Sequence, residues 1–180
     1  MSCNRTCESG GIRMSLIMKR KSIREFTNTP ITNEQIKQLL TSAMQAPSAK
    51  NQQPWDFIVV DDRTMLDKLS TMHIGSWPLK TAPLAIIPVL RESDKSPRMT
   101  VQDVSASVEN ILLEAVNLEL GAVWIGVYPL EERIEHINNI FDFPQSNQPF
   151  AILAIGHPLK DKEITIRYDE SRVFRNKWGK

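Results

Sequence analysis

The sequence has little of what marks disulfide-rich or metal-binding proteins. Its 180 residues include only two cysteines, and both, Cys3 and Cys7, lie within the first seven residues. So close a pair could form a disulfide or supply half of a metal site, but no second pair follows to build either framework. The three histidines are scattered, without the short spacing of metal ligands. The sequence therefore predicts no metal site.

Long apolar runs and an excess of one charge are also missing. The longest apolar run, residues 82–90, is strand-sized and contains two prolines, so it is too short to cross a bilayer. The polar residues 1–13 lack the apolar core of a secretion signal. With 22 basic and 21 acidic residues, the formal net charge of +1 gives no overall attraction for nucleic acid or membranes. A cytoplasmic protein that binds neither is predicted.

Glycine-rich phosphate loops and a dedicated acid–base set are absent as well. Neither the P-loop pattern nor the dinucleotide-binding fingerprint occurs in the sequence. Ser22 and Ser48 have no histidine close by in the sequence that could activate them as nucleophiles. A base from a distant part of the chain stays an alternative. If the protein is an enzyme, a bound cofactor is therefore expected to carry the reaction.

The hydrophobic pattern predicts one α+β domain over residues 14–180, preceded by a disordered extension over residues 1–13. The charged tail, residues 160–180, is expected to wrap over the protein surface or over a partner. Helices are expected at 15–20, from Thr32 with Gln35 in a capping box, from Asp62, and from Thr100 to a stop at Gly121. The buried side of this last helix is predicted to be Val101, Val104, Val108, Ile111, Leu112, Ala115 and Leu118. Strands are expected at 55–60, 84–90, 122–127 and 150–155.

Three segments carry residues suited to binding a ligand. The basic segment, residues 20–24, reads Arg-Lys-Ser-Ile-Arg. Arginine can hold phosphate oxygens in bidentate fashion and serine adds a neutral donor, so the segment suits a phosphate group. In an extended turn, Arg20, Ser22 and Arg24 would share one side. Taken alone, so short a charge run is more often a solvated surface.

The other two segments are less charged. The polar loop, residues 47–54, places amide side chains between two prolines, and amides suit the mixed donor and acceptor edge of a heterocycle. Its composition also fits an ordinary turn-rich connection. The glycine strand, residues 121–127, includes Gly126, where a flat ligand could approach the backbone closely. Taken alone, its Trp124 is better explained as a simple core residue.

Taken together and in this order, these segments resemble the nitroreductase family of FMN-dependent oxidoreductases. The similarity runs from about Met14 to Trp178. It rests on RKSIREF at 20–26, APS at 46–48 with NQQPW at 51–55, APLAI at 82–86, QD and EN at 102–103 and 109–110, LGAVWIG at 120–126, and DESRV with NKW at 169–173 and 176–178. The resemblance implies an α+β fold with a mixed central β-sheet flanked by helices. It also implies an intertwined homodimer with FMN at the subunit interface.

The resemblance further implies roles for individual residues. Arg20 and Ser22 are expected to hold the FMN phosphate, helped by Lys21 and Arg172, while Arg24 reaches the ribityl chain or the pyrimidine edge. Residues expected to line the flavin from the other subunit are Pro47, Ser48, Ala49 and Asn51. Backbone groups of Ile125, Gly126 and Val127 are expected near N5 of the ring. No side chain is expected to be catalytic, since the flavin carries the chemistry and Arg24 and the backbone near Gly126 tune it.

The implied function is an oxidoreductase with a ping-pong mechanism. NADH or NADPH would reduce FMN and leave, and a small oxidised acceptor such as a nitroaromatic or a quinone would then take the electrons. One alternative is a non-catalytic flavin-binding carrier or redox sensor of the same fold. A cofactor-free interaction domain is a third hypothesis.

Overall fold

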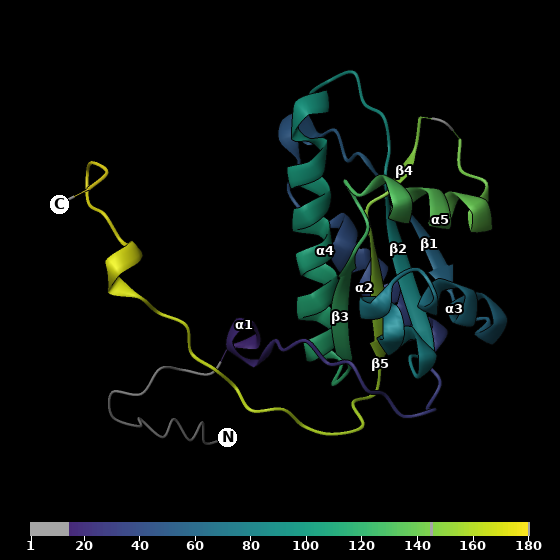
Figure 1. The fold of residues 1–180 in the computed structure, drawn as a ribbon. Coiled ribbons are helices and arrows are strands. Elements are labelled where there is room, and N and C mark those ends of the chain that lie inside the picture. Colours follow the sequence, from purple (N-terminus) through teal and green to yellow (C-terminus); the bar gives the residue numbers. More distant parts are fainter. Residues whose placement is uncertain (1–14, 145, 180) are drawn as a thin grey trace, which may run out of the picture.

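The structure is a computed structural model that describes residues 15–144 and 146–179 (Figure 1). Its centre is a sheet in the order β1-β2-β5-β3, in which all the paired strands are antiparallel; β4 pairs with the end of β2. The strands are β1 (Trp55–Val60), β2 (Leu84–Leu90), β3 (Gly121–Gly126), β4 (Gln148–Pro149) and β5 (Ala151–Gly156). A parallel pairing comes from a single bridge, between Ser22 and Ala122. The predicted α+β class with a central sheet between helices is confirmed.

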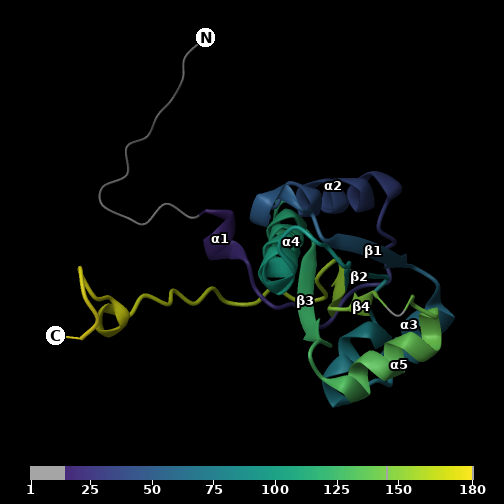
Figure 2. The ribbon, with the colours of Figure 1, turned by 90° about the horizontal axis from the view of Figure 1, so that it is seen from above.

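Helices cover both faces of the sheet, which gives three layers (Figure 2). One face carries α2 (Asn33–Met44) and α4 (Thr100–Asn117), and the other carries α3 (Arg63–Ser70), α5 (Glu131–Phe141) and the 3-10 helix η2 (Ile74–Lys80). Strands β2 and β5 are buried along their whole length because each sends alternate side chains into the two layers. Apolar runs at these two positions in the sequence therefore mark the middle of the sheet.

Two helix starts form as the sequence predicts. The Thr32 side chain accepts a hydrogen bond from the Gln35 N–H at 3.2 Å, and the Gln35 side chain accepts one from the Thr32 N–H at 2.9 Å. This reciprocal pair satisfies two backbone donors that a helix start otherwise leaves open. Asp62 caps α3 in the same way, through a 2.9 Å bond from the Met65 N–H.

The start and end of α4 differ from the prediction. Thr100 is the first helical residue and not its cap, because the 3-10 turn η3 (Pro97–Met99) leads directly into the helix. Val101, predicted to be buried, is 38% exposed. Gly121 does not end the helix: the chain reverses at Glu119, a non-glycine residue with φ of 58°, and Gly121 is already the first residue of β3.

The two ends of the described chain lie outside the three-layered body. The short helix α1 (Leu16–Lys19) stands beside α4, and the segment after β5 leads away from the body to a 3-10 turn, η4 (Glu170–Arg172) (Figures 1 and 2). The start of the tail contacts the basic segment, through Lys21 and Asp161, and the rest leads away from the body. A contact of the tail with a partner stays a prediction. The predicted extension 1–13, with Cys3 and Cys7, lies outside the described residues. Within the residues the structure describes, no helix is long and apolar enough to cross a membrane.

Candidate functional site

The basic segment lies against the outer edge of β3. Ile23 is buried, and its N–H donates to the Ala122 carbonyl at 3.0 Å. A Cβ on Gly121 would stand 2.6 to 2.8 Å from the side-chain carbons of Ile23, so only glycine allows the two backbones to approach this closely. With Ile23 turned inward, Ser22 and Arg24 on either side of it are left on the outer side, as the sequence predicts.

These outward side chains line a cavity of about 590 Å³. Residues 20–22 and Arg24 of the basic segment line it, together with tail residues 162, 163 and 165–168, which include the cations Lys162 and Arg167. Among the described residues, neither the Ser22 hydroxyl nor the Arg24 guanidinium has a hydrogen-bond or ion-pair partner. Arg20 makes one contact, a 3.6 Å approach of its Nε to Glu109, where both side chains are partly exposed. These donors fit a phosphate dianion, because several cations and a hydroxyl line one hollow, although the carboxylate of Glu163 lines it too.

Lys21 lines the same cavity but is already paired with protein groups, and Arg172 does not line it. The Lys21 ammonium is 2.5 Å from an Asp161 carboxylate oxygen and also donates to the Lys162 carbonyl, so it ties the basic segment to the start of the tail. The hydrogen bond from Lys21 is the largest cause that lowers the pKa of Asp161. Arg172, on η4, is 84% exposed and pairs with Asp169 at 3.0 Å, outside the cavity. The phosphate roles of Lys21 and Arg172 stay predictions.

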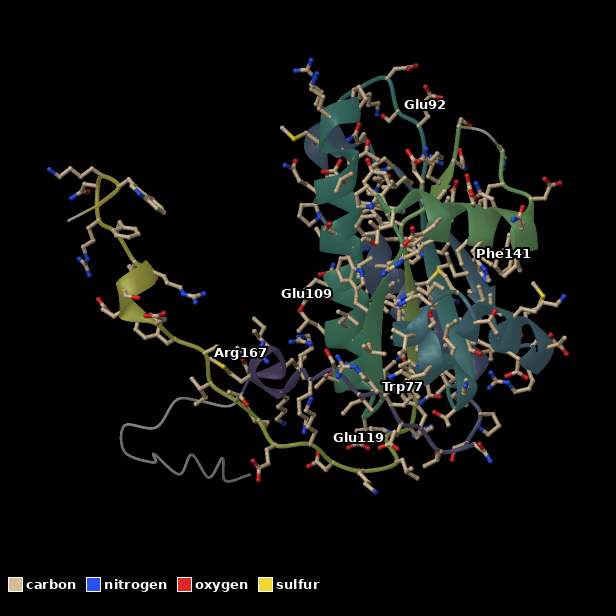
Figure 3. All side chains as sticks on the ribbon, viewed as in Figure 1. Trp77, Glu92, Glu109, Glu119, Phe141 and Arg167 are labelled. Atoms are coloured by element: carbon tan, nitrogen blue, oxygen red, sulfur yellow. The ribbon has the colours of Figure 1, made fainter. Side chains whose placement is uncertain are left out.

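A second hollow of about 340 Å³ adjoins the basic segment and contains a residue that the sequence did not single out. Trp77, on η2, is 42% exposed and lines this hollow with Ser22, Arg24 and Lys160 (Figure 3). Glu25 and Asp161 line the same hollow, so Trp77 stands among charges of both signs. A large, half-exposed aromatic side chain is suited to contact a flat ligand. Trp77 lies outside the three segments that the sequence marked for ligand binding, and no motif around it indicates a site.

The polar loop has an unusual backbone. Lys50, Asn51 and Gln53 have φ of 51°, 50° and 48°, in the left-handed region that non-glycine residues rarely adopt. Such conformations cost about 1 kcal/mol or more each and persist only where the surroundings impose them. The loop is held partly from within, since the Gln53 N–H donates to the Ser48 hydroxyl at 3.0 Å.

The main support of the polar loop is Asp103, in the first turn of α4. This carboxylate is 7% exposed; it accepts the Ala49 N–H at 3.0 Å on one oxygen and the Gln52 side-chain amide at 2.5 Å on the other. The sequence offered one signal: Asp103 lies four and eight residues before the buried Ser107 and Ile111, within the apolar stripe of the helix. An acid in such a stripe needs partners.

At the far end of the glycine strand, Gly126 has free space beside it: a Cβ built there would meet only Arg133 Nη1, at 3.9 Å. The Ile125 and Val127 side chains are buried in the core, so only their backbones can contribute to a site. The Gly126 carbonyl accepts a 2.7 Å hydrogen bond from Arg133 of α5, a partner that the sequence did not reveal. Near Arg133 lies His73, whose pKa is lowered by burial first and by the charge of Arg133 second.

The three predicted segments do not form one site within a single chain. The polar loop lies at the start of α4, while the basic segment contacts Glu109 halfway along it and continues to the foot of β3 (Figures 1 and 3). Asp103 and Glu109 are six residues apart, so they point to different sides of the helix. No polar-loop residue lines the cavity of the basic segment.

Comparisons with a family model, with related sequences and with solved structures agree with one another. The model of the nitroreductase family matches residues 17–91 and 78–157. A Methanothermobacter thermautotrophicus protein named "Putative NADH dehydrogenase/NAD(P)H nitroreductase" is 40% identical over 92% of this chain and 87% of its own length. A Clostridium acetobutylicum structure, called a "Putative NADH Oxidase", has a TM-score of 0.88 at 42% identity over 91% of this chain and 100% of its own. An FMN-dependent nitroreductase from Clostridium difficile has a TM-score of 0.84 at 29% identity, over 91% and 98%.

Proposed function

Since the chain belongs to the nitroreductase family of oxidoreductases, we propose that it binds FMN and passes electrons from NADH or NADPH to a small oxidised acceptor such as a nitroaromatic or a quinone. The observation that carries this proposal is the basic cavity, where the donors of Ser22 and Arg24 lack protein partners within the described chain. The FMN dependence of the Clostridium difficile relative supports the choice of cofactor. A cytoplasmic location belongs to the same proposal.

In this proposal, the residues of the chain bind FMN and orient its ring. Arg20 and Ser22 would hold the phosphate, and Arg24, next to them on the same wall, would reach toward the ring with its positive charge. That charge would stabilise negative charge that builds up during hydride transfer. Gly126 leaves its strand edge open to a flat ring, and Arg133 fixes the orientation of its carbonyl. When bound, FMN would supply the two-electron chemistry that no side chain here can perform.

The proposal includes an intertwined homodimer with a flavin site at each side of the interface. Its support is the separation of the polar loop from the basic cavity: a second copy can bring Pro47, Ser48, Ala49 and Asn51 to a cavity that their own chain does not reach. The tail also exposes large apolar side chains outside the body, which a partner would cover. They include Ile166, Tyr168, Phe174 and Trp178. A ping-pong order follows if nicotinamide and acceptor occupy the same face of the ring in turn.

The test is the anaerobic addition of NADH or NADPH to the purified yellow protein. Loss of the flavin absorbance near 450 nm within the mixing time of roughly seconds, and its return when a quinone is added, is the expected result. Flavin that stays oxidised with both nicotinamides would contradict the enzyme and support a carrier or sensor. A colourless protein that takes up no FMN would support the interaction domain. A flavin-loaded monomer in sizing experiments would contradict the dimer alone.

A further inference from the structure

We propose that Asp103 is a positioning residue for the flavin site: its buried carboxylate holds the polar loop in its binding shape before any flavin arrives. The inference rests on the proposed function, because the loop's role as a flavin wall belongs to that proposal. Asp103 itself touches no part of the basic cavity. It acts through Ala49 and Gln52, and through the dimer it acts on the site of the other subunit.

The geometry of the clamp is specific. The two carboxylate oxygens of Asp103 each receive a different donor, the Ala49 N–H at 3.0 Å and the Gln52 amide at 2.5 Å. These donors flank Lys50 and Asn51, two of the three residues with left-handed backbone. Both Asp103 and Gln52 are at least nine-tenths buried, so water competes little for these bonds. The turn also has two backbone bonds of its own, from the Gln52 N–H to the Ala49 carbonyl at 3.1 Å and from the Asn51 N–H to the Ser48 carbonyl at 3.0 Å. The carboxylate adds the two bonds that tie this turn to α4.

Gln52 extends the clamp to a second loop. Its side-chain amide also donates to the Ser96 carbonyl at 3.0 Å, and the Lys50 ammonium donates to the Lys95 carbonyl at 2.9 Å. Arg91, at the start of that second loop, donates to the Gln53 carbonyl at 3.0 Å. The polar loop and residues 91–98 are therefore held as one unit, with Asp103 at its buried end. A wall held in this way needs little ordering when a ligand binds, which strengthens binding.

The direct test compares Asp103→Ala with the wild-type dimer in two measurements. We expect the affinity for FMN to fall about 10- to 100-fold, since a charged, buried hydrogen-bond acceptor is lost. In the apoprotein, we expect amide hydrogen exchange to speed up over residues 48–53 while exchange in β5 stays unchanged. Asp103→Asn keeps an oxygen for the Ala49 N–H and should recover part of both losses. Asp67→Ala, which removes an exposed ion pair from α3, is the matched control and should change neither.

Mixed dimers separate positioning from a general loss of fold. When Arg20→Ala and Asp103→Ala subunits are combined, one interface regains an intact Arg20 and an intact polar loop. We expect one tight FMN site per mixed dimer, although neither parent has any. If Asp103→Ala does not fold, Gln52→Met breaks the same clamp from the loop side and should give the same local exchange and weaker binding.

Three outcomes would overturn the proposal. They are wild-type FMN affinity in folded Asp103→Ala or in Gln52→Met, faster exchange spread over the whole protein, and mixed dimers with no tight site. The proposed function fails in a different way, through wild-type protein that binds no FMN. In that case the exchange of residues 48–53 in the apoprotein still decides whether Asp103 holds the loop.

Discussion

The basic segment and the polar loop are both predicted to bind the same flavin, yet they are built in opposite ways. The basic segment is open: Ser22 and Arg24 have no protein partners among the described residues, and they face a cavity of about 590 Å³. The polar loop is strained and tightly held, with hydrogen bonds to Ser48, Asp103 and the 91–98 loop. The two regions would therefore contribute to flavin binding in different ways. The open segment offers attraction, and the closed loop offers a shape that exists beforehand.

The largest effect that would sharpen this comparison comes from the ligand itself. FMN at 1,000 times its dissociation constant should raise the free energy of unfolding by about 4 kcal/mol. Amide exchange should slow strongly over residues 20–26, whose donors gain a partner, and weakly over residues 48–53, which are already bonded. Thermal unfolding and hydrogen exchange with and without FMN measure both. Equal slowing in the two regions would remove the distinction between them.

A smaller effect is expected from removing one cation of the open segment. Arg20→Ala should weaken FMN binding by roughly 1–3 kcal/mol, the value of a charge-assisted hydrogen bond to phosphate. Added salt should weaken wild-type binding more than binding by the variant, because part of the attraction is electrostatic and exposed. Titrations of flavin fluorescence measure both, with Lys80→Ala as a control cation outside the cavity. Wild-type affinity in Arg20→Ala would mean that the phosphate lies elsewhere.

The smallest effect concerns His73, which belongs to neither region and lies near Arg133, the partner of the Gly126 carbonyl. The pKa of His73 is lowered by burial and by Arg133, so the unfolded chain binds a proton there more readily than the folded one. As the pH falls below the ordinary histidine value of about 6.5, the free energy of unfolding should therefore decrease. His73→Asn keeps an acceptor for the Gly75 N–H, now bonded at 2.9 Å, and cannot titrate. Denaturant unfolding at pH 7.5 and 5.5 should show a smaller loss in this variant; an equal loss would assign the pH dependence to other groups.

The elements that could be predicted from the sequence are those fixed by local patterns. The capping box of Thr32 and Gln35 and the apolar runs of β1 and β2 each determine their structure within a few residues. The predictions that were wrong concern Thr100 and Gly121, where the neighbouring turn or a distant side chain decides the outcome. A local pattern contains no information about either.

The candidate site divides in the same way. Arg20, Ser22 and Arg24 could be placed on one wall because alternation along an extended segment is a local property. Asp103 and Arg133 could not be assigned roles, because each role depends on contacts. The loop that Asp103 contacts lies about fifty residues earlier in the chain. Arg133 donates to the Gly126 carbonyl across the turn between β3 and α5, and no sequence pattern predicts the shape of that turn. Partners of buried polar groups are set by the tertiary fold.

Gly121 has a consequence that reaches beyond its own strand. It offers no side chain, and the missing Cβ is what lets Ile23 pack this closely against β3 beside Ser22 and Arg24, the predicted phosphate donors. The substitution Gly121→Ala would push Ile23 away from β3, and Ser22 and Arg24 would move with it. The placement of the proposed anion-binding residues therefore depends on a glycine that is not one of them.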